Sequence, residues 1–218
     1  MSTENCLICG NSTHEIKDPQ IKVTHSVCDK CGFIHKNRDY HLSNDKEHEE
    51  YKRHNNSFES TGYVKMFENF ISEHVKPLKI TGKALEFGSG PGPVLMELLK
   101  REGLEMYDYD PFFNPNTEYL NHKYNLITST EVVEHFVNPL KEFSHLSSLL
   151  AENGYLVIMT NFNTFSDVDF LKWWYRRDYT HISFYTIKSF EYIASLYNLE
   201  VVSHNNKNVI IFKRKGIE

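Results

Sequence analysis

The stretch that most constrains how this chain can fold is residues 83–93, in which an apolar run is followed by an acid and then by alternating glycines. The acid is Glu86 and the glycines are Gly88, Gly90 and Gly92. Glycines at a turn let a ligand lie against the backbone, where any Cβ would collide with it. Pro93 suits the first position of a helix, and a helix N-terminus offers unpaired N–H groups and a positive dipole end to that ligand. The sequence therefore predicts a nucleotide-type cofactor site at the tip of the first strand of an α/β sheet.

The spacing of these residues indicates which cofactor class to expect. The dinucleotide pattern is G-x-G-x-x-G with an acid about 20 residues further on, but here Pro93 stands where its last glycine would be. The pattern Glu-x-Gly-x-Gly-x-Gly resembles motif I of the Rossmann-like S-adenosylmethionine-dependent methyltransferases. In that family the acid lies near the amino acid part of the cofactor. The resemblance implies cofactor contacts from Glu86, Gly88, Ser89, Gly90 and Gly92.

Two later segments resemble further motifs of the same family. Residues 104–111 are expected to form a second strand that ends in acid, and in the family an acid at this strand tip accepts hydrogen bonds from both ribose hydroxyls. The resemblance favours Asp110 for this role, with Asp108 as the alternative. Residues 124–136 resemble the fourth strand and the motif after it, which the small-molecule branch commonly writes with Glu-His. The further cofactor contacts implied there are Thr130 and Glu131.

The remainder of the chain completes the predicted topology. The expected elements are a helix that begins at Asn138-Pro139 and ends at Gly154, a strand over 155–160, a helix over 186–197 and a hairpin of 200–203 with 209–212. A terminal antiparallel hairpin on a parallel sheet is a hallmark of the methyltransferases. We therefore predict an α/β fold with a mostly parallel Rossmann-like methyltransferase sheet. Only 13 residues separate Asp110 from Tyr124, too few for a normal third strand and its adenine-reading turn, so the adenine contacts are not assigned.

All cysteines of the chain lie in its first 31 residues, as two C-x2-C pairs separated by 18 residues. They are Cys6, Cys9, Cys28 and Cys31. This spacing is typical of a structural zinc site closed by four thiolates, with no open position for chemistry. The alternative is two disulfides or four inert thiols, but a reducing cell interior would keep the cysteines unpaired. Residues 1–36 are thus predicted to form a zinc-ribbon hook, because a segment this short cannot otherwise bury a core.

A polar stretch over residues 37–60 is expected to link the hook to the methyltransferase domain at 61–218. From Thr61 an amphipathic helix is predicted, whose apolar face is Tyr63, Met66, Phe67, Phe70 and Ile71. N-terminal helices of such methyltransferases lie over the cofactor cleft. The polar cluster before this helix is either plain linker or part of a lid that contacts substrate. Its candidate substrate residues are Tyr51, His54 and Asn55.

A second polar and aromatic cluster covers residues 173–185, between the predicted fifth strand and the next helix. With the hooks and the Glu-His motif, it resembles a group of small bacterial zinc-ribbon methyltransferases. Aromatic rings attract a methyl sulfonium and line a partly dry pocket, so Trp174 and Tyr175 are candidate substrate contacts, although core packing is the alternative. His181 and His135 are candidate general bases, since imidazole titrates near neutral pH. Asp178 is the candidate that orients His181.

Composition limits the function classes. The net charge of −5 gives no electrostatic footprint for nucleic acid, no apolar run approaches the length of a membrane span, and residues 1–10 lack the pattern of a secretory signal. We therefore expect a cytoplasmic S-adenosylmethionine-dependent methyltransferase with a structural zinc, acting on an O or N nucleophile of a small molecule. The alternatives are an RNA methyltransferase that uses the hook for recognition and a non-catalytic cofactor-binding adaptor. The oligomeric state is left open.

Overall fold

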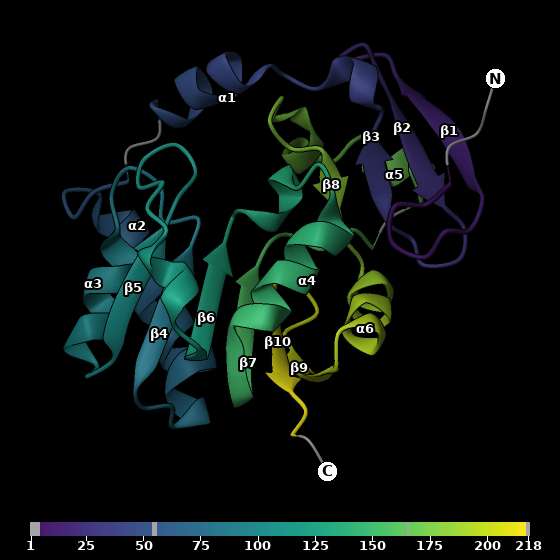
Figure 1. The fold of residues 1–218 in the computed structure, drawn as a ribbon. Helices are drawn as coiled ribbons and strands as arrows, with labels where there is room; N and C mark the ends of the chain where they lie inside the picture. Colours follow the sequence, from purple (N-terminus) through teal and green to yellow (C-terminus); the bar gives the residue numbers. More distant parts are fainter. Residues whose placement is uncertain (1–4, 54–55, 165, 217–218) are drawn as a thin grey trace.

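The computed structural model describes residues 5–53, 56–164 and 166–216, which form two sheets (Figure 1). The larger sheet has the order β5-β4-β6-β7-β10-β9. Its first four strands run parallel, while β10 pairs antiparallel with both β7 and β9. The strands are β4 (Lys83–Phe87), β5 (Glu105–Tyr109), β6 (Tyr124–Thr130), β7 (Leu150–Met159), β9 (Leu199–His204) and β10 (Val209–Arg214). The predicted mostly parallel sheet with a terminal antiparallel hairpin is confirmed.

Helices cover both faces of this sheet, each through an apolar side. On one face α2 (Thr61–Phe70) and α3 (Val94–Arg101) share a core, into which α3 buries Val94, Leu95, Leu98 and Leu99. On the other face α4 (Pro139–Leu149) and α6 (Ile187–Leu196) bury Phe143, Leu146, Phe190 and Ile193. The result is the three-layer arrangement in which a parallel sheet is covered on both sides.

Two details differ from the sequence-based expectation or sharpen it. The helix α4 ends at Leu149 and β7 starts at the next residue, so the expected helix end at Gly154 is wrong. The left-handed turn falls on Asn153, whose φ is 58°, and Gly154 is needed because a Cβ there would lie 2.7 Å from the Tyr124 carbonyl oxygen. Between β5 and β6 the described chain forms one short 3-10 helix, η4 (Glu118–Asn121), and no strand, as the short spacing predicted.

The N-terminal region forms a second sheet of order β1-β2-β3-β8 (Figure 1). Its strands are β1 (Thr13–Asp18), β2 (Val23–Cys28), β3 (Ile34–Lys36) and β8 (Ser183–Phe184). The fourth strand therefore comes from the far end of the chain, through antiparallel pairing of Ile34 with Phe184 and His35 with Ser183. The hook is thus built into the rest of the molecule by main-chain hydrogen bonds, which the sequence did not indicate.

The segment between the hook and α2 lies across the top of the molecule in Figure 1 as α1 (Asn44–Tyr51), after the turn η1 (Arg38–Tyr40). A π-helical turn η2 (Ile71–Val75) and the turn η3 (Lys76–Leu78) continue α2. Three short elements hold the loops near the hook and the sheet edge: η5 (Val133–His135), α5 (Asp167–Phe170) and η6 (Trp174–Arg177). Within the described residues, no helix combines the length and apolar character that a membrane crossing requires.

Candidate active site

A cavity of about 810 Å³ opens at the carboxyl ends of β4, β5 and β6, the edge at which α/β sheets bind ligands. Strand tips, the glycine-rich turn, α1, α2 and the loop around η6 enclose it. The predicted site residues that line it are Tyr51, Glu86, Gly88, Ser89, Gly90, Asp110, Thr130, Glu131, His135, Trp174, Tyr175, Asp178 and His181. His54 and Asn55 lie outside the described residues. Met66 also lines the cavity and is 37% exposed, so it is not part of the buried face expected for α2.

Two glycines of the glycine-rich turn have no room for a side chain. Gly88 has φ +86°, and a Cβ there would lie 2.3 Å from Cγ2 of Val132. A Cβ on Gly92 would lie 1.6 Å from the carbonyl oxygen of Asn56, which belongs to the segment after α1. Gly90 also has a left-handed φ, of +66°. At these glycines the turn therefore presents only backbone atoms, and the segment after α1 lies directly against it at Gly92.

Glu86 lies beneath this turn and is only 3% exposed. Its Oε2 accepts a hydrogen bond of 2.8 Å from the backbone N–H of Met96, in the first turn of α3. Burial raises its pKa to about 8, and the charges of Asp108 and Asp110 act in the same direction. A positively charged ligand group at this position would therefore offset the negative charge of these carboxyl groups.

The two acids at the end of β5 differ in their partners. Asp110 accepts hydrogen bonds from the backbone N–H groups of Gly90 (2.9 Å), Phe112 (2.8 Å) and Phe113 (3.0 Å). Asp108 accepts from the Ser89 hydroxyl at 3.1 Å and from the Asn114 side-chain amide at 2.8 Å. Asp110 lines the cavity, whereas Asp108 is not among the lining residues. Asp110 thus ties the glycine-rich turn to the turn after β5 at the cavity wall.

Two acids, only one of them buried, lie at the end of β6. Glu131 has a left-handed φ of 54°, unusual for a residue with a Cβ, and Glu134 is fully buried. The Tyr175 hydroxyl donates to Glu134 Oε1 at 2.5 Å and lies 3.1 Å from Glu131 Oε2. Burial raises the pKa of Glu134 well above its ordinary value, and the neighbouring Glu131 raises it further. Sequence reasoning gave Glu134 no role, although its place beside His135 in the Glu-His motif was a usable signal.

The two candidate bases converge. The ring centroids of His135 and His181 are 5.0 Å apart. Nδ1 of His135 lies 3.0 Å from the Thr180 carbonyl oxygen, and Nδ1 of His181 lies 2.8 Å from the Tyr175 carbonyl oxygen. Because a carbonyl accepts only, both imidazoles are held with Nδ1 as the donor.

Asp178 lies close enough to His181 to interact with it electrostatically. Its Oδ2 is 3.8 Å from Nε2 of His181, which is an ion-pair distance without a hydrogen bond. Burial alone would raise the pKa of Asp178, but the His181 charge and hydrogen bonds from Thr180 lower it below its ordinary value. Asp178 is therefore held in its ionised form beside His181.

The segment over the cleft contributes polar and aromatic contacts. The Tyr51 ring lies 5.3 Å from the His135 ring, and its hydroxyl donates to Glu47 at 2.5 Å. His48 stacks on Phe112, in the turn after β5, with ring centroids 5.1 Å apart. Trp174, by contrast, is 64% exposed at the cavity wall. The segment that carries α1 and the loop around η6 therefore form the side of the cavity that faces the glycine-rich turn.

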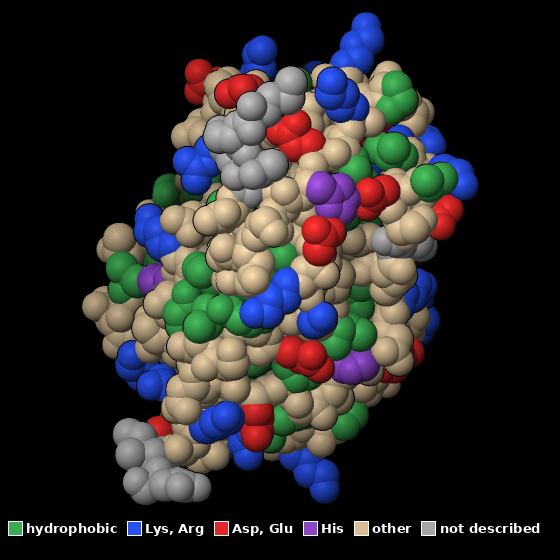
Figure 2. Space-filling model, turned by 90° about the vertical axis from the view of Figure 1, so that its right-hand side faces the viewer, with side chains coloured by type: hydrophobic (Ala, Val, Ile, Leu, Met, Phe, Trp, Pro, Cys, Tyr) green, Lys and Arg blue, Asp and Glu red, His purple; other side chains and the backbone are tan. Residues whose placement is uncertain are grey.

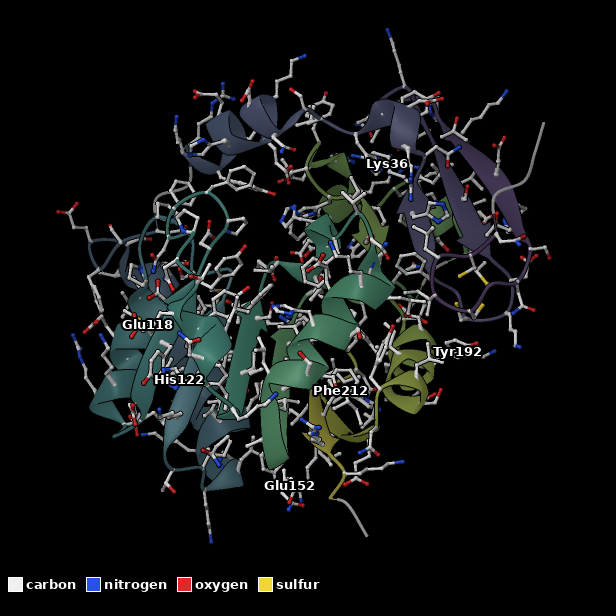
Figure 3. All side chains as sticks on the ribbon, viewed as in Figure 1. Lys36, Glu118, His122, Glu152, Tyr192 and Phe212 are labelled. Carbon is white, nitrogen blue, oxygen red and sulfur yellow. The ribbon has the colours of Figure 1, made fainter. Side chains whose placement is uncertain are left out.

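The four cysteines form one buried cluster, whose sulfur atoms group at the hook in Figure 3. Sγ of Cys6 lies 3.6 Å from that of Cys31, Sγ of Cys9 lies 3.4 Å from that of Cys28, and all four lie within 4.8 Å of one another. A tetrahedral zinc with Zn–S bonds of about 2.3 Å separates its sulfurs by about 3.8 Å. The cluster holds no disulfide, and its donor set and spacing fit a small zinc hook.

The hook also contacts the loop that carries His181. Lys36, at the end of β3 (Figure 3), donates from its backbone N–H to the Ile182 carbonyl and from Nζ to the Tyr179 carbonyl. Arg176 and Asp18 form an ion pair of 3.1 Å at exposures of 1% and 0%. These contacts connect residues more than 140 positions apart, and no sequence pattern indicated them.

The fold and this cavity define a class of protein, the Rossmann-like S-adenosylmethionine-dependent methyltransferases. Residues 65–204 match the family described as a methyltransferase domain, so the chain belongs to that family. No curated protein matches the chain in sequence.

Solved structures with TM-scores just above 0.5 share the fold at low sequence identity. Magnesium protoporphyrin IX methyltransferase from Synechocystis PCC 6803, solved with bound S-adenosylhomocysteine, is 15% identical with a TM-score of 0.52, over 82% of this chain and 97% of that one. A methyltransferase from Archaeoglobus fulgidus is 16% identical with a TM-score of 0.52, over 69% and 94% of the two chains. A domain of citrinin polyketide synthase, 15% identical with a TM-score of 0.45, is matched over 72% of this chain but only 53% of its own length.

Proposed function

We propose that the chain transfers a methyl group from S-adenosylmethionine to an O or N nucleophile of a small molecule, and that a structural zinc holds its N-terminal hook. The observation that carries this proposal is the cavity in which the glycine-rich turn, two histidines and a lid segment face one another. The domain boundaries that go with it are a hook at 1–36, a lid segment at 37–60 and a methyltransferase domain at 61–218.

The residues around the turn suit the cofactor. Bound S-adenosylmethionine supplies an electrophilic methyl carbon on a sulfonium; transfer breaks the C–S bond, forms a bond to the acceptor O or N, and leaves S-adenosylhomocysteine and a proton. Glu86, Gly88 and Gly90 would hold the amino acid end, and Asp110 the ribose. Ser89, Thr130 and Glu131 complete the proposed cofactor contacts, whereas Gly92 packs against Asn56 and is not among the lining residues.

The histidines suit the acceptor half of the site. His135 or His181 would take the proton that the acceptor loses, at the nitrogen not held by a backbone carbonyl. Asp178 would stabilise the resulting imidazolium of His181. Alignment of nucleophile, methyl carbon and sulfur supplies the larger part of such a rate enhancement, and Tyr51, Trp174 and Tyr175 would shape the pocket that enforces it.

The charge of the cavity favours a small acceptor over a polyanion. Among the described residues, its lining contains one lysine, Lys141, and six carboxyl side chains: Glu47, Glu86, Asp110, Glu131, Glu142 and Asp178. Figure 2 shows Lys and Arg side chains intermingled with Asp and Glu on the face that it presents. An RNA methyltransferase needs a basic surface for phosphates, so this lining supports a neutral or cationic small molecule instead.

Calorimetric titration with S-adenosylmethionine and S-adenosylhomocysteine tests the proposal. We expect micromolar binding by the wild type, weakened about 10–100-fold in Asp110→Ala, because hydrogen bonds to a charged group contribute about 1.5–3 kcal/mol. Asp108→Ala in the same assay decides between the two ribose candidates. Absence of binding by the zinc-loaded wild type would overturn the enzyme proposal, while binding without turnover of any acceptor would leave the adaptor.

A further inference from the structure

A second group of side chains that could hold a metal ion lies at the cavity wall: His135 and His181 line the cavity, and Glu134 is buried beside them. Glu134, His135 and His181 each offer one ligand atom, and these three atoms lie within 4.8 Å of one another. Ligand atoms bound at about 2.1 Å to a single ion are separated by up to about 4.2 Å. Small side-chain rotations therefore bring all three to bonding distance.

The two histidines are oriented in the way that metal ligands are. Each donates Nδ1–H to a backbone carbonyl, His135 to Thr180 and His181 to Tyr175. This places the lone pair of each imidazole on Nε2. Histidine ligands of metals almost always make such an outer hydrogen bond, which fixes the tautomer and the ring orientation. The accepting carbonyls belong to one loop, whose Ile182 N–H in turn binds the Glu134 carbonyl at 2.9 Å.

The carboxylate provides an independent observation. Glu134 is fully buried, and its Oε1 accepts from the Tyr175 hydroxyl. Its Oε2 is also buried but has no hydrogen-bond partner among the described residues. A buried polar atom in that state costs about 1–3 kcal/mol, and more when it is charged. Glu131 and Asp178 add negative charge nearby, so a cation is the ligand that compensates this site.

We infer that Glu134, His135 and His181 bind a divalent first-row transition metal ion. Two imidazoles and one carboxylate suit Zn²⁺, Fe²⁺, Mn²⁺ or Co²⁺, and three protein ligands leave coordination positions open. With the ion bound, both Nε2 atoms are ligands and the histidines no longer act as the general base. An acceptor hydroxyl bound to the ion instead has its pKa lowered by the metal charge and releases its proton to solvent. Metal binding itself does not depend on the proposed methyl transfer, but the role for the ion in activating an acceptor rests on that proposed function.

The test uses the full-length protein with its cysteine site loaded with zinc, stripped of loosely bound metal and titrated with Co²⁺. We expect one further equivalent of Co²⁺, with visible d–d bands and without the thiolate-to-cobalt charge-transfer band that cysteine ligands produce. Glu134→Gln, His135→Ala and His181→Ala should each weaken this binding by more than about 100-fold, since even the loss of an outer partner costs about 10–100-fold. The matched control is His204→Ala, an exposed histidine outside the cavity lining.

Retention of one zinc per chain and an unchanged thermal unfolding curve show that a variant is folded. If His135→Ala unfolds, His135→Gln replaces it, and the spectrum of the wild type alone still decides the ligand type. The proposal is overturned if the wild type takes up no second equivalent, or if that equivalent persists in all three variants. Because no cofactor is present, the result stands apart from the methyltransferase proposal: a chain that binds S-adenosylhomocysteine but no Co²⁺ retains that function and loses only this site.

Discussion

Glu86 is buried like a core residue but has an ionisable carboxyl group, and without a ligand its burial disfavours the charged form. It is 3% exposed, its Oε2 accepts from Met96, and its pKa is raised to about 8, mainly by burial. An unfolded chain releases this proton near pH 4.5, whereas the folded chain keeps it until about pH 8. Between these values the folded state binds more protons, so the free energy of unfolding falls as the pH rises.

Replacing Glu86 with glutamine should remove this dependence. The amide oxygen of Glu86→Gln still accepts the Met96 N–H, but nothing at the position titrates. We expect the slope of the unfolding free energy between pH 5 and pH 8 to become less negative by up to about 1.4 kcal/mol per pH unit. Urea titrations across this range, without cofactor, measure it, and Glu97→Gln on the exposed side of α3 is the control. An unchanged slope would contradict the buried, protonated state.

Gly88 shows how the absence of one Cβ shapes the glycine-rich turn. Gly88→Ala adds a side chain at φ +86° and places it 2.3 Å from Val132. We expect the free energy of unfolding to fall by about 2–4 kcal/mol, because left-handed strain and overpacking act together. Gly103→Ala is a matched control, because Gly103 has φ +92° with nothing within 4 Å, so it carries strain alone and should cost about 1–2 kcal/mol. Equal losses in urea unfolding would show that Val132 moves aside.

At the scale of elements, the parts that sequence could predict are those with local causes. The apolar period of residues 94–99 defines α3. The Thr186 cap, with its partner Ser189, defines the start of α6. In contrast, β8 is two residues long and exists because the backbone of β3 lies beside it. No propensity or period marks a strand of that length. The orientation of His135 and His181 was equally hidden, because backbone carbonyls fix it.

The same limit applies to the ion pair that joins β1 to η6. Asp18 and Arg176 are both almost completely buried, and Arg176 also donates to Gln20 at 3.0 Å. A sequence shows only that Asp and Arg are mostly exposed residues. Their pairing follows from the docking of the hook against the loop, which is a tertiary event.

A double-mutant cycle measures how much this ion pair contributes to the free energy of unfolding. Arg176→Met should lower the free energy of unfolding by about 3–5 kcal/mol, because it leaves the Asp18 carboxylate buried without its partner. Asp18→Asn keeps an oxygen for the Gln20 and Ile21 N–H groups that Asp18 now accepts. We expect the double variant to be more stable than Arg176→Met alone, with a coupling energy of at least about 2 kcal/mol. Additive losses would mean that the two charges act independently.

At the scale of the molecule, the cavity has two walls of different origin. The glycine-rich turn, Glu86 and Asp110 belong to the large sheet. The core on one face of this sheet includes the hook residues Ile8 and Phe33, whereas the core residues on the other face all lie after residue 60. The loop with His181 is held by the hook, through β8, Lys36 and Arg176. The hook therefore supports the wall that carries His181, and its integrity should matter to that wall more than to the wall formed by the glycine-rich turn.

Loss of the proposed zinc should affect these two walls differently. In Cys9→Ser, which leaves Glu134 and the histidines unaltered, we expect backbone amides of residues 178–184 to exchange hydrogen much faster while those of β4 stay protected. S-adenosylhomocysteine binding should change by less than about threefold, since the hydrogen bonds of β3 and Lys36 reach β8 and Tyr179 rather than Glu86 or Gly88. Hydrogen exchange followed by mass spectrometry and calorimetry on the same samples give both values. Equal deprotection of β4 would mean that the metal supports the whole fold, and continued protection of 178–184 would mean that β8 holds the loop without it.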